Sequence, residues 1–532
     1  MFDLSALDAP RLIGRGDLQQ ALRSHIEGGV LIISRRGCAG IGATSLARRL
    51  ASDAQADYPD GCIEINLRGS AAGGLTQPAP AAVQRRILKM LDQDVQLPET
   101  PRALRKRYLD TLRHSRIVLI LDDVASPSQL RTLLPRHGST AIITSTEDLS
   151  ASFPRLHVAY VDDLSPNDIY HLMVQGAPDA ANLPNSAVKR ISERLEGNPL
   201  ALRIAAPLLG QHHRLALRDL LRALDLARRR IVALQGAATP NTPIDVAIET
   251  CYDAMSTELR ERFEALAIFP APFAEDAAAT VWKIPTAEAR ETLTALARAS
   301  LVDHHARAGL YEVHQRVRTL MQELLLGQRQ RSRDIVSRYV GHYLRAAIQI
   351  SAALSTPSPR TRSGSVAPYL IWDHIPTAWE RLNGEDPGWP KPAGMDRWIR
   401  EFPLYSRALL NVLLSRGEYR DWLSRSLSIA ATTDDPRLQC ALLGALGQTQ
   451  ADMEQHNDAL VSFERQREIA RACEAQDYEA EALMFAGTSL GAIGKLSEAE
   501  AGWRHALQLF ELLGDPRALE IRQWLVQLQG AA

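Results

Sequence analysis

One short stretch limits the folds open to this chain more than any other. Residues 30–34 form an apolar run that leads into the loop Ser34-Arg35-Arg36-Gly37-Cys38-Ala39-Gly40-Ile41-Gly42-Ala43-Thr44-Ser45, and residues 44–56 have a helical pattern. Glycines in such a loop let backbone N–H groups surround phosphate oxygens, while the helix points its positive end at the anion. The spacing is that of a nucleotide phosphate loop, Gly-x-x-x-x-Gly-Lys-Ser/Thr.

The loop lacks its lysine, because Ala43 occupies that position while Gly37, Gly42 and Thr44 remain in register. The lysine would contact the β- and γ-phosphates, and such a charge-assisted contact contributes ~1.5–3 kcal/mol. Its loss predicts roughly ten- to hundredfold weaker binding. Thr44 still offers a hydroxyl to Mg²⁺. We therefore expect ADP or ATP with Mg²⁺ to bind weakly or not at all.

Further apolar runs follow the loop and predict a parallel sheet with helices on both faces. The runs cover 62–67, 116–123, 141–145 and, as a short edge strand, 157–161, and helical patterns cover 79–94 and 101–114. The run at 116–123 ends in Asp122-Asp123. A strand end followed by a turn explains this pair simply, but with the loop upstream Asp122 is the expected Mg²⁺ acid and Asp123 the water-orienting acid.

Composition indicates a protein of several domains without a dominant charge. The chain has 532 residues, and 61 Lys and Arg nearly balance 62 Asp and Glu. The basic run Arg228-Arg229-Arg230 is therefore interpreted as a solvated helix end. The five cysteines lack metal-site spacing, which favours reduced thiols and a cytoplasmic location. Neither a signal peptide nor a membrane span is expected.

From about residue 165 the pattern is helical. Ser165 and Pro166 are typical of a helix start, and helices over 187–235 are interrupted at 196–200. Residues 245–330 combine short helices with two short strands at 300–303 and 310–313, an order that resembles a winged helix. Residues 355–400 are rich in Pro, Gly and Ser, which predicts a partly irregular connector.

The C-terminal region contains an internal repeat. Gly447, Ala459 and Phe463 are followed forty residues later by Gly487, Ala499 and Trp503. A small residue, alanine twelve positions on and an aromatic four further is the tetratricopeptide pattern of paired antiparallel helices. An earlier copy, less well matched, is expected around Gly417, Tyr419 and Trp422.

Together these motifs resemble the NB-ARC group of STAND-class signalling ATPases, especially bacterial members related to actinobacterial antibiotic-production regulators. The resemblance covers nearly the whole chain, and its motifs follow the family's order. They are Leu12-Ile13-Gly14-Arg15, the phosphate loop, Tyr58-Pro59-Asp60-Gly61, Asn66-Leu67-Arg68-Gly69, Leu121-Asp122-Asp123-Val124, Leu133-Leu134-Pro135, Ile143-Thr144-Ser145, Leu164-Ser165-Pro166, Gly197-Asn198-Pro199-Leu200-Ala201-Leu202 and Tyr311-Glu312-Val313-His314-Gln315.

The resemblance implies a switch in which ADP holds a closed state and a ligand on the repeats favours an ATP-bound open state. It implies that Arg15 lies near adenine, that Pro199 packs by the base and that His314 touches the β-phosphate. The remaining residues implied to bind nucleotide or Mg²⁺ are Gly37, Gly40, Gly42, Ala43, Thr44 and Ser45, with Asp122 and Asp123 as the acids; Thr44 and Asp122 would hold the metal.

Four positions depart from the family pattern. Besides Ala43, Thr146 stands where an arginine usually senses the γ-phosphate, Gln315 replaces an aspartate, and Gly16 replaces an acidic residue. Compensation by Arg35, Arg36 or Arg48 is conceivable, although Arg48 lies a turn down the helix. Because two phosphate-sensing cations are missing together, we expect a pseudo-NTPase without meaningful hydrolysis, and the chain is not expected to be an enzyme.

The expected fold class is α/β followed by all-α. The expected domains are a P-loop NTPase (NB-ARC-like) domain at 1–163, a helical domain at 164–240, a winged helix at 241–330, a helical and irregular connector at 331–400, and tetratricopeptide-like repeats at 401–532.

Three functions remain open. The first is a signalling scaffold or sensor whose repeats bind a protein or peptide, with homo-oligomers as a further option for the chain. The second is an ATP/ADP-switched regulator of transcription or defence. The third is a DNA-binding winged helix, which we consider unlikely because no basic recognition helix of groove length stands out. No membrane partner is expected.

Overall fold

The computed structural model describes residues 12–34, 38–69, 77–92, 95, 97–176, 184–209, 216–235, 242–355 and 371–531. Contacts divide the chain into two compact units. The first comprises the chain up to His342 together with Pro376–Pro392, and the second comprises Tyr343–Ile375 and the residues from Ala393 onward.

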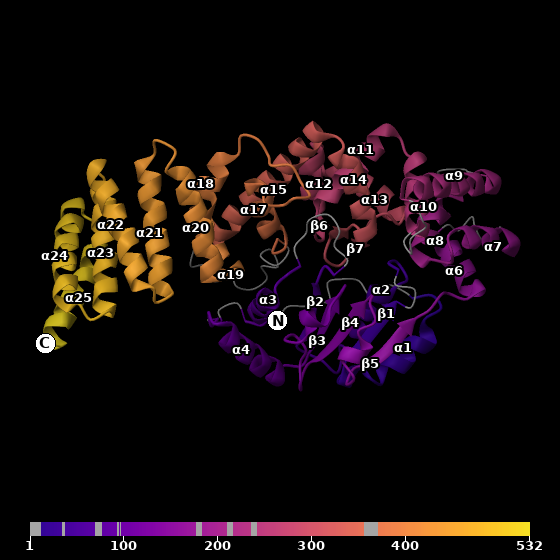
Figure 1. Cartoon of the computed structure of the whole chain (residues 1–532), viewed down its shortest axis with the longest axis horizontal. Helices are drawn as coiled ribbons and strands as arrows, with labels where there is room; N and C mark the ends of the chain where they lie inside the picture. Colours follow the sequence, from indigo (N-terminus) through magenta and orange to yellow (C-terminus); the bar gives the residue numbers. More distant parts are fainter. Residues whose placement is uncertain are drawn as a thin grey trace. The chain divides into compact units, whose positions relative to one another are not determined.

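The first unit contains the predicted parallel sheet (Figure 1). Its strand order is β2-β3-β4-β1-β5, and every neighbouring pair is parallel. β3 and β4 are buried along their whole length, as expected for central strands with helices on both faces. β5 lies at the edge, as predicted. The strand bounds are β1 Val30–Ser34, β2 Gly61–Asn66, β3 Ile117–Asp122, β4 Thr140–Ser145 and β5 His157–Val161.

Amphipathic helices cover this sheet. α2 buries Leu46, Ala47 and Leu50 in a core shared with apolar side chains of β1, β3 and β4. α4 buries Leu104, Tyr108 and Leu112, one residue per helical turn, so its opposite face is left to solvent. The helix bounds are α1 Gly16–Arg23, α2 Ala43–Asp53, α3 Pro80–Leu91, α4 Pro101–His114 and α5 Pro127–Leu130.

Helices follow the sheet as predicted. The Asp168 amide donates to Ser165 Oγ at 3.2 Å at the start of α6, which confirms this helix start. Arg228 pairs with Glu196 at 2.5 Å and Arg230 with Glu249 at 2.9 Å, so the basic run is an ion-paired helix face. The bounds are α6 Pro166–Gly176, α7 Asn185–Arg194, α8 Pro199–Ala205, α9 Leu217–Gln235 and α10 Thr242–Asp253.

A small antiparallel sheet of order β6-β8-β7 lies among the next helices. Of the two short strands expected from the sequence, β8 lies where it was predicted, whereas β7 begins at Asp303, three residues later than the predicted strand at 300–303. β6 adds a third strand that the sequence did not predict. The bounds are α11 Thr257–Ala265, β6 Phe273–Ala274, α12 Glu275–Trp282, α13 Thr286–Arg298, β7 Asp303–His305, β8 Leu310–Glu312, α14 Gln315–Leu326, α15 Arg329–Ser355 and α17 His374–Asn383. Residues 356–370 of the expected connector lie outside the described residues.

A buried cation anchors Pro376–Pro392 within the first unit. Arg381 pairs with Asp386 at 2.9 Å, with both side chains only 1% exposed. Its guanidinium also donates to the Ile268 carbonyl at 2.6 Å and lies against the rings of Tyr339 and Trp389, at 4.9 and 4.8 Å from their centroids. All of its charge is therefore compensated inside the unit.

The second unit is built from helices that pack in sequence order. A Cβ at Gly447 would lie 2.5 Å from the Phe463 ring, and one at Gly487 would lie 2.6 Å from Trp503. The small and aromatic residues of the repeat thus meet across paired helices. The bounds are α18 Asp396–Tyr405, α19 Arg407–Leu413, α20 Arg416–Ala430, α21 Pro436–Asp452, α22 His456–Ala472, α23 Gln476–Ala492, α24 Leu496–Leu513 and α25 Arg517–Ala531.

Two absences concern only the part of the chain that the structure describes. None of its helices combines the length and the apolar character of a membrane-spanning segment. No group of three or more His, Cys, Asp and Glu side chains there is arranged to hold a metal ion.

Candidate functional site

The phosphate loop joins β1 to α2 at the carboxyl edge of the sheet, where parallel α/β sheets bind ligands. Gly40 and Gly42 have φ of +74° and +100°, which favour glycine, and a Cβ at Gly42 would meet no described atom within 4 Å. The N-cap residue of α2 is Gly42, so this position provides no side chain to cap the helix, which begins at Ala43. The N–H groups of its first turn therefore face the loop as an anion site requires. Arg35, Arg36 and Gly37 lie outside the described residues.

Asp122 gathers hydroxyl and amide donors at the end of β3. Its Oδ1 accepts from Thr44 Oγ1 at 2.8 Å and from Thr144 Oγ1 at 2.6 Å, and its Oδ2 accepts from Asn66 Nδ2 at 3.2 Å. Burial, together with the nearby Glu64 carboxylate, raises the pKa of Asp122 to about 6. The structure thus brings together Thr44 and Asp122, the two residues expected to hold Mg²⁺.

Asp123 adopts a left-handed conformation with φ of +55° directly after β3. Its amide donates to Thr144 Oγ1 at 3.0 Å, and its carbonyl accepts from the Gly69 amide at 2.7 Å. A Cβ at Gly69 would lie 2.4 Å from that carbonyl, so the turn after β2 closes tightly on Asp123. Of the two expected acids, Asp122 is therefore a buried carboxylate, whereas Asp123 is a turn residue.

Arg48 links the five-stranded parallel sheet to the small antiparallel sheet by contacts with both. Its Nε and Nη2 donate to both carboxylate oxygens of Glu64 at 2.8–3.1 Å, and its Nη2 also lies 3.0 Å from Glu312 Oε2 on β8. His305 Nε2 lies 3.0 Å from the same Glu312 oxygen. Although burial opposes the charge, the two carboxylates raise the pKa of Arg48. As the sequence analysis indicated, this side chain is directed away from the loop.

The segment Asn198-Pro199-Leu200 forms hydrogen bonds with the phosphate loop. Asn198 Nδ2 donates to the Ala39 carbonyl at 3.0 Å, and the Leu200 amide donates to the Gly40 carbonyl at 3.2 Å. A Cβ at Gly40 would lie 2.7 Å from the Cβ of Leu200, so any larger residue would separate the two segments. Pro199 opens α8, and Asn198 caps that helix through the Ala201 amide. Pro199 therefore lies beside the loop.

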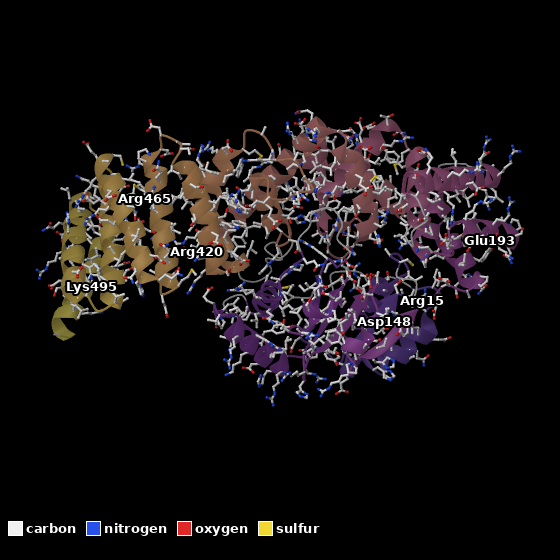
Figure 2. The ribbon with its side chains drawn as sticks, in the orientation of Figure 1. Arg15, Asp148, Glu193, Arg420, Arg465 and Lys495 are labelled. Atoms are coloured by element: carbon white, nitrogen blue, oxygen red, sulfur yellow. The ribbon has the colours of Figure 1, made fainter. Side chains whose placement is uncertain are left out.

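Arg15, directly before α1, forms hydrogen bonds near the phosphate loop (Figure 2). Its Nη2 donates to the Asp162 carbonyl at 2.6 Å and reaches the Ile41 carbonyl at 3.4 Å. Burial lowers the pKa of Arg15, against the opposing influence of Asp162, Asp168 and Asp163. The structure thus places Arg15 next to the loop.

His314 caps α14, where its Nδ1 accepts from the Arg316 amide at 3.2 Å. Burial lowers the pKa of His314, while Asp303 and Glu312 oppose that shift. The neighbouring Gln315 accepts a hydrogen bond from Arg318. His314 is therefore fixed at the start of α14 by its own helix. Its described hydrogen bond joins it to α14.

A buried arginine on the same helix was not anticipated. Arg318 donates to the carbonyls of Phe269 at 3.2 Å and Pro270 at 2.8 Å. Burial and the neighbouring Arg68 lower the pKa of Arg318 to about 10, partly offset by Glu312 and Asp123. Arg68 and Asp123 follow β2 and β3, so Arg318 is within electrostatic range of the ends of these strands. In the sequence, only the charge of Arg318 between apolar positions hinted at this burial.

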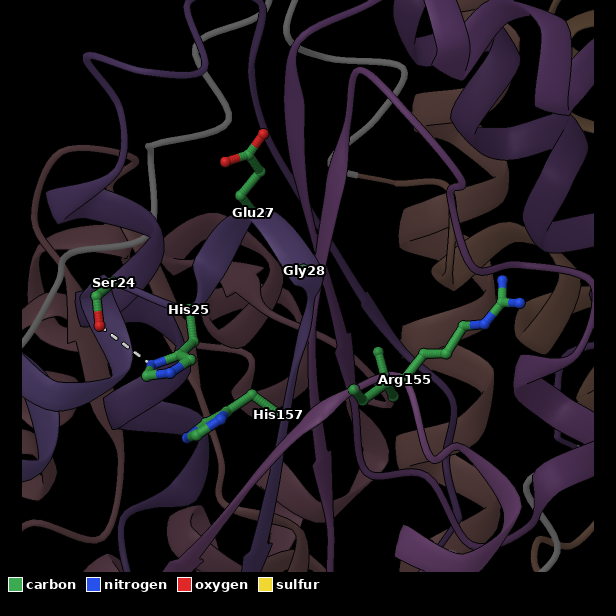
Figure 3. Close-up of a pocket in the computed structure, with 7 residues that line it drawn as sticks. Ser24, His25, Glu27, Gly28, Arg155 and His157 are labelled. Carbon is green, nitrogen blue, oxygen red and sulfur yellow. Dashed lines mark hydrogen bonds between the residues drawn. The ribbon is translucent and has the colours of Figure 1, made fainter.

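A separate hollow of about 550 Å³ lies at the opposite edge of the sheet (Figure 3). It is lined by Ser24, His25, Glu27, Gly28, Arg155, Leu156 and His157. Val30 and His157 are paired at the starts of β1 and β5, whereas the phosphate loop follows the other end of β1. The His25 and His157 rings stack at 3.7 Å. This hollow is distinct from the candidate nucleotide site.

The five-stranded parallel sheet, with the glycine-rich loop between β1 and α2 at its carboxyl edge, has the fold of a P-loop protein. No protein-family model matches the chain. Over 317 residues it is 27% identical to the regulatory protein AfsR of Streptomyces griseus, a match that covers 58% of this chain and 32% of AfsR. Over 178 residues it is 29% identical to disease resistance protein At4g27190 of Arabidopsis thaliana, covering 31% of this chain and 18% of that protein.

The chain is thus related to the AfsR regulators and to a disease resistance protein of Arabidopsis thaliana, which confirms the resemblance seen in its motifs. It spans about a third of the length of AfsR. Among solved structures, a Signal Transduction ATPase with Numerous Domains (STAND) protein with a tetratricopeptide repeat sensor from Pyrococcus horikoshii has a TM-score of 0.46 at 15% identity. That match covers 99% of this chain and 87% of the other.

Proposed function

We propose that this chain is a STAND-class regulatory protein whose closed form is held by protein contacts and only weakly by nucleotide. The observation that carries the proposal is Arg48, whose guanidinium is shared between Glu64 of the sheet domain and Glu312 of β8. An arginine neutralised by two carboxylates has little charge to offer a phosphate. With Ala43 in the lysine position, phosphate binding would depend on backbone N–H groups and Mg²⁺.

The residues present fit a nucleotide in part. Among the described residues, the open space at Gly42, the glycine N-cap of α2 and the hydrogen bond between Thr44 and Asp122 are compatible with a phosphate and a divalent cation. Bound Mg²⁺ would neutralise phosphate charge, with Thr44 and Asp122 as the protein groups that hold it. In this proposal Arg15, Pro199 and His314 surround the rest of the nucleotide, and Asp123 lies beside the metal acid.

The remaining parts of the chain would transmit and receive the signal. We assign 164–240 as a helical domain, 241–330 as a winged helix that serves as an intramolecular lid, and 401–532 as tetratricopeptide-like repeats. Paired helices of this kind offer an extended surface for a peptide or a folded protein. The repeats would bind a protein or peptide partner, and partner binding would favour separation of the Arg48 contacts.

Calorimetric titration of ADP and ATP with Mg²⁺ into wild type and Ala43→Lys tests the proposal. A new charge-assisted contact in the variant should tighten nucleotide binding roughly ten- to hundredfold. Wild type should bind weakly or not at all. Tight ADP binding by wild type, unchanged in Ala43→Lys, would overturn the proposal, because the backbone loop would then suffice without a cation.

A second candidate, an ATP/ADP-switched regulator, draws support from one observation. Thr44 and Asp122 lie in hydrogen-bond contact at 2.8 Å, the arrangement that a metal-dependent NTPase needs. Phosphate release by wild type above the background of a Thr44→Ala/Asp122→Asn double variant would favour this candidate. Equal rates in the two proteins would favour the scaffold.

A further inference from the structure

The outer face of α4 concentrates positive charge on a chain that is nearly neutral overall. Its fourteen residues contain five Arg and Lys but only one acidic residue, Asp110, whereas the whole chain has 61 basic and 62 acidic residues. Leu104, Tyr108 and Leu112 are buried at intervals of four, which turns the basic side chains to solvent. These five residues, hereafter the α4 basic face, are Arg102, Arg105, Lys106, Arg107 and Arg113, and all five are exposed.

The α4 basic face differs from other arginine-rich surfaces of the protein in how its charge is compensated. In the second unit several exposed arginines are paired, for example Arg504 with Glu500 at 2.6 Å and Arg522 with Glu511 at 2.6 Å. Across the described ranges, none of the five side chains of the α4 basic face makes an ion pair or hydrogen bond. A set of uncompensated like charges on one rigid face costs free energy by repulsion, unless an anionic partner covers it.

A neighbouring loop extends the basic face at the end of α4. A Cβ at Gly138 would lie 2.5 Å from the Arg113 carbonyl and 2.9 Å from the Leu112 carbonyl, so this loop packs directly on the helix end. Tyr108 Oη donates to the Leu133 carbonyl at 2.6 Å and fixes the start of the same segment. The exposed Arg136 lies two residues before Gly138 and therefore belongs to the loop that packs on this helix end.

We propose that the α4 basic face binds the phosphate backbone of nucleic acid without reading sequence. From Arg102 to Arg113 the helix rises about 17 Å, enough to follow several phosphates of a duplex that carries one charge per ~1.7 Å. Four of the five cations are arginines, whose planar guanidinium can bind phosphate oxygens in a bidentate manner.

An anionic membrane is less suited to this surface. Helices that lie in a membrane interface insert large apolar side chains between the lipids. The exposed large apolar residues of the described chain include none between 101 and 116. The face is thus polar throughout and matches a hydrated polyanion.

This inference departs from the sequence-based expectation that DNA binding is unlikely. That expectation concerned the winged helix and its recognition helix, whereas α4 belongs to the sheet domain. The inference also stands apart from the proposed function, because it needs neither nucleotide binding nor the Arg48 contacts.

Fluorescence anisotropy with a labelled 20-base-pair duplex of arbitrary sequence, titrated with the full chain at 50–200 mM salt, tests the proposal. The variant Arg102→Gln/Lys106→Gln/Arg113→Gln removes three phosphate contacts and leaves the buried side of α4 intact. The slope of log K against log salt should fall by about 3. Wild-type affinity should therefore change about 40-fold more than the variant's across this salt range.

Two matched controls accompany the variant. Arg465→Gln/Arg504→Gln/Arg522→Gln makes the same charge change on the repeats (Arg465 is labelled in Figure 2) and should keep the wild-type slope. Arg102→Lys/Arg113→Lys retains the charge of the α4 basic face and should keep most of the slope. Circular dichroism verifies that each variant folds.

Three outcomes would overturn the proposal. One is the absence of duplex binding by wild type at 50 mM salt. Another is the same slope for wild type and the α4 variant. The third is wild-type binding to vesicles of phosphatidylserine and phosphatidylcholine without duplex binding, which would assign the face to a membrane.

Discussion

Replacing Arg48 by methionine should weaken the contact between the sheet domain and β8. The change keeps an apolar stem but leaves Glu64 and Glu312, which are 13% and 27% exposed, without their shared cation. Removing one partner of a buried ion pair costs about 3–5 kcal/mol, because the remaining charge stays desolvated. Here two carboxylates lose the same partner, and Asp122 lies in the same electrostatic neighbourhood.

Amide hydrogen exchange measures this loss locally, which suits a chain of several domains that need not unfold in one step. A loss of about 3 kcal/mol corresponds to roughly 150-fold faster exchange of the protected amides in β8 and α14. The matched control is Arg504→Met, which removes an exposed ion pair with Glu500. This variant should change the exchange rates of protected amides by less than about threefold.

The double variant Arg48→Met/Glu312→Gln sharpens the test. If Arg48 and Glu312 are coupled, the β8 amides of the double variant should exchange more slowly than the product of the two single-variant effects predicts. The reason is that the double variant has no carboxylate at position 312 that lacks the Arg48 cation. Unchanged protection in β8 after Arg48→Met would refute the reasoning. So would a loss confined to α2 and β2, since the network would then stabilise only the sheet domain.

Three other changes should have measurable effects. Arg381→Met should destabilise the first unit by about 3–5 kcal/mol in urea unfolding, because the buried Asp386 carboxylate loses its ion-pair partner. Replacing both residues by apolar ones should lower the free energy of unfolding by less. Gly447→Ala should destabilise the second unit by roughly 1–3 kcal/mol, since its Cβ would overlap the Phe463 ring; an unchanged melting temperature would contradict the packing. Burial raises the pKa of Asp122 from 3.8 to about 6, so the folded protein binds this proton before the unfolded chain does. Wild type should therefore gain stability relative to Asp122→Asn as the pH falls from about 6 to 4, and a constant difference in melting temperature would oppose the assignment.

The sequence predicted the sheet domain well because its signals are local. Each of the five strands is a largely apolar run that ends at, or directly before, an acidic or polar residue, and the observed bounds differ from the predicted ones by a residue or so. Helix starts such as Ser165-Pro166 are likewise predicted by the residue types at adjacent positions. The repeat was found because Gly447 and Phe463 recur at a fixed interval as Gly487 and Trp503.

The interactions that connect elements were not predictable in the same way. Arg48, Glu64 and Glu312 lie far apart in the sequence, and only the tertiary fold brings their charges together. One local signal existed, since Glu64 is a charged residue inside a largely apolar strand and such a charge requires a partner when buried. The identity of that partner does not follow from the strand. The α4 basic face was not predicted because the net charge of the chain is balanced, and the exposure of its five cations depends on how α4 packs.

The missing lysine and the Arg48 network have a joint consequence for regulation. A phosphate bound at the start of α2 would attract the nearest available cation, and Arg48 lies one turn along that helix. Arg48 can turn to the phosphate only by releasing Glu64 and Glu312, so nucleotide binding through this residue would compete with closure. Ala43→Lys supplies a cation without that exchange. We therefore expect Ala43→Lys to bind nucleotide with β8 still protected, whereas nucleotide recruited by Arg48 in the wild type would expose β8 to exchange. Hydrogen exchange of both proteins with and without MgADP distinguishes the two arrangements, and protection of β8 that MgADP leaves unchanged in a nucleotide-bound wild type would show that Arg48 takes no part in binding.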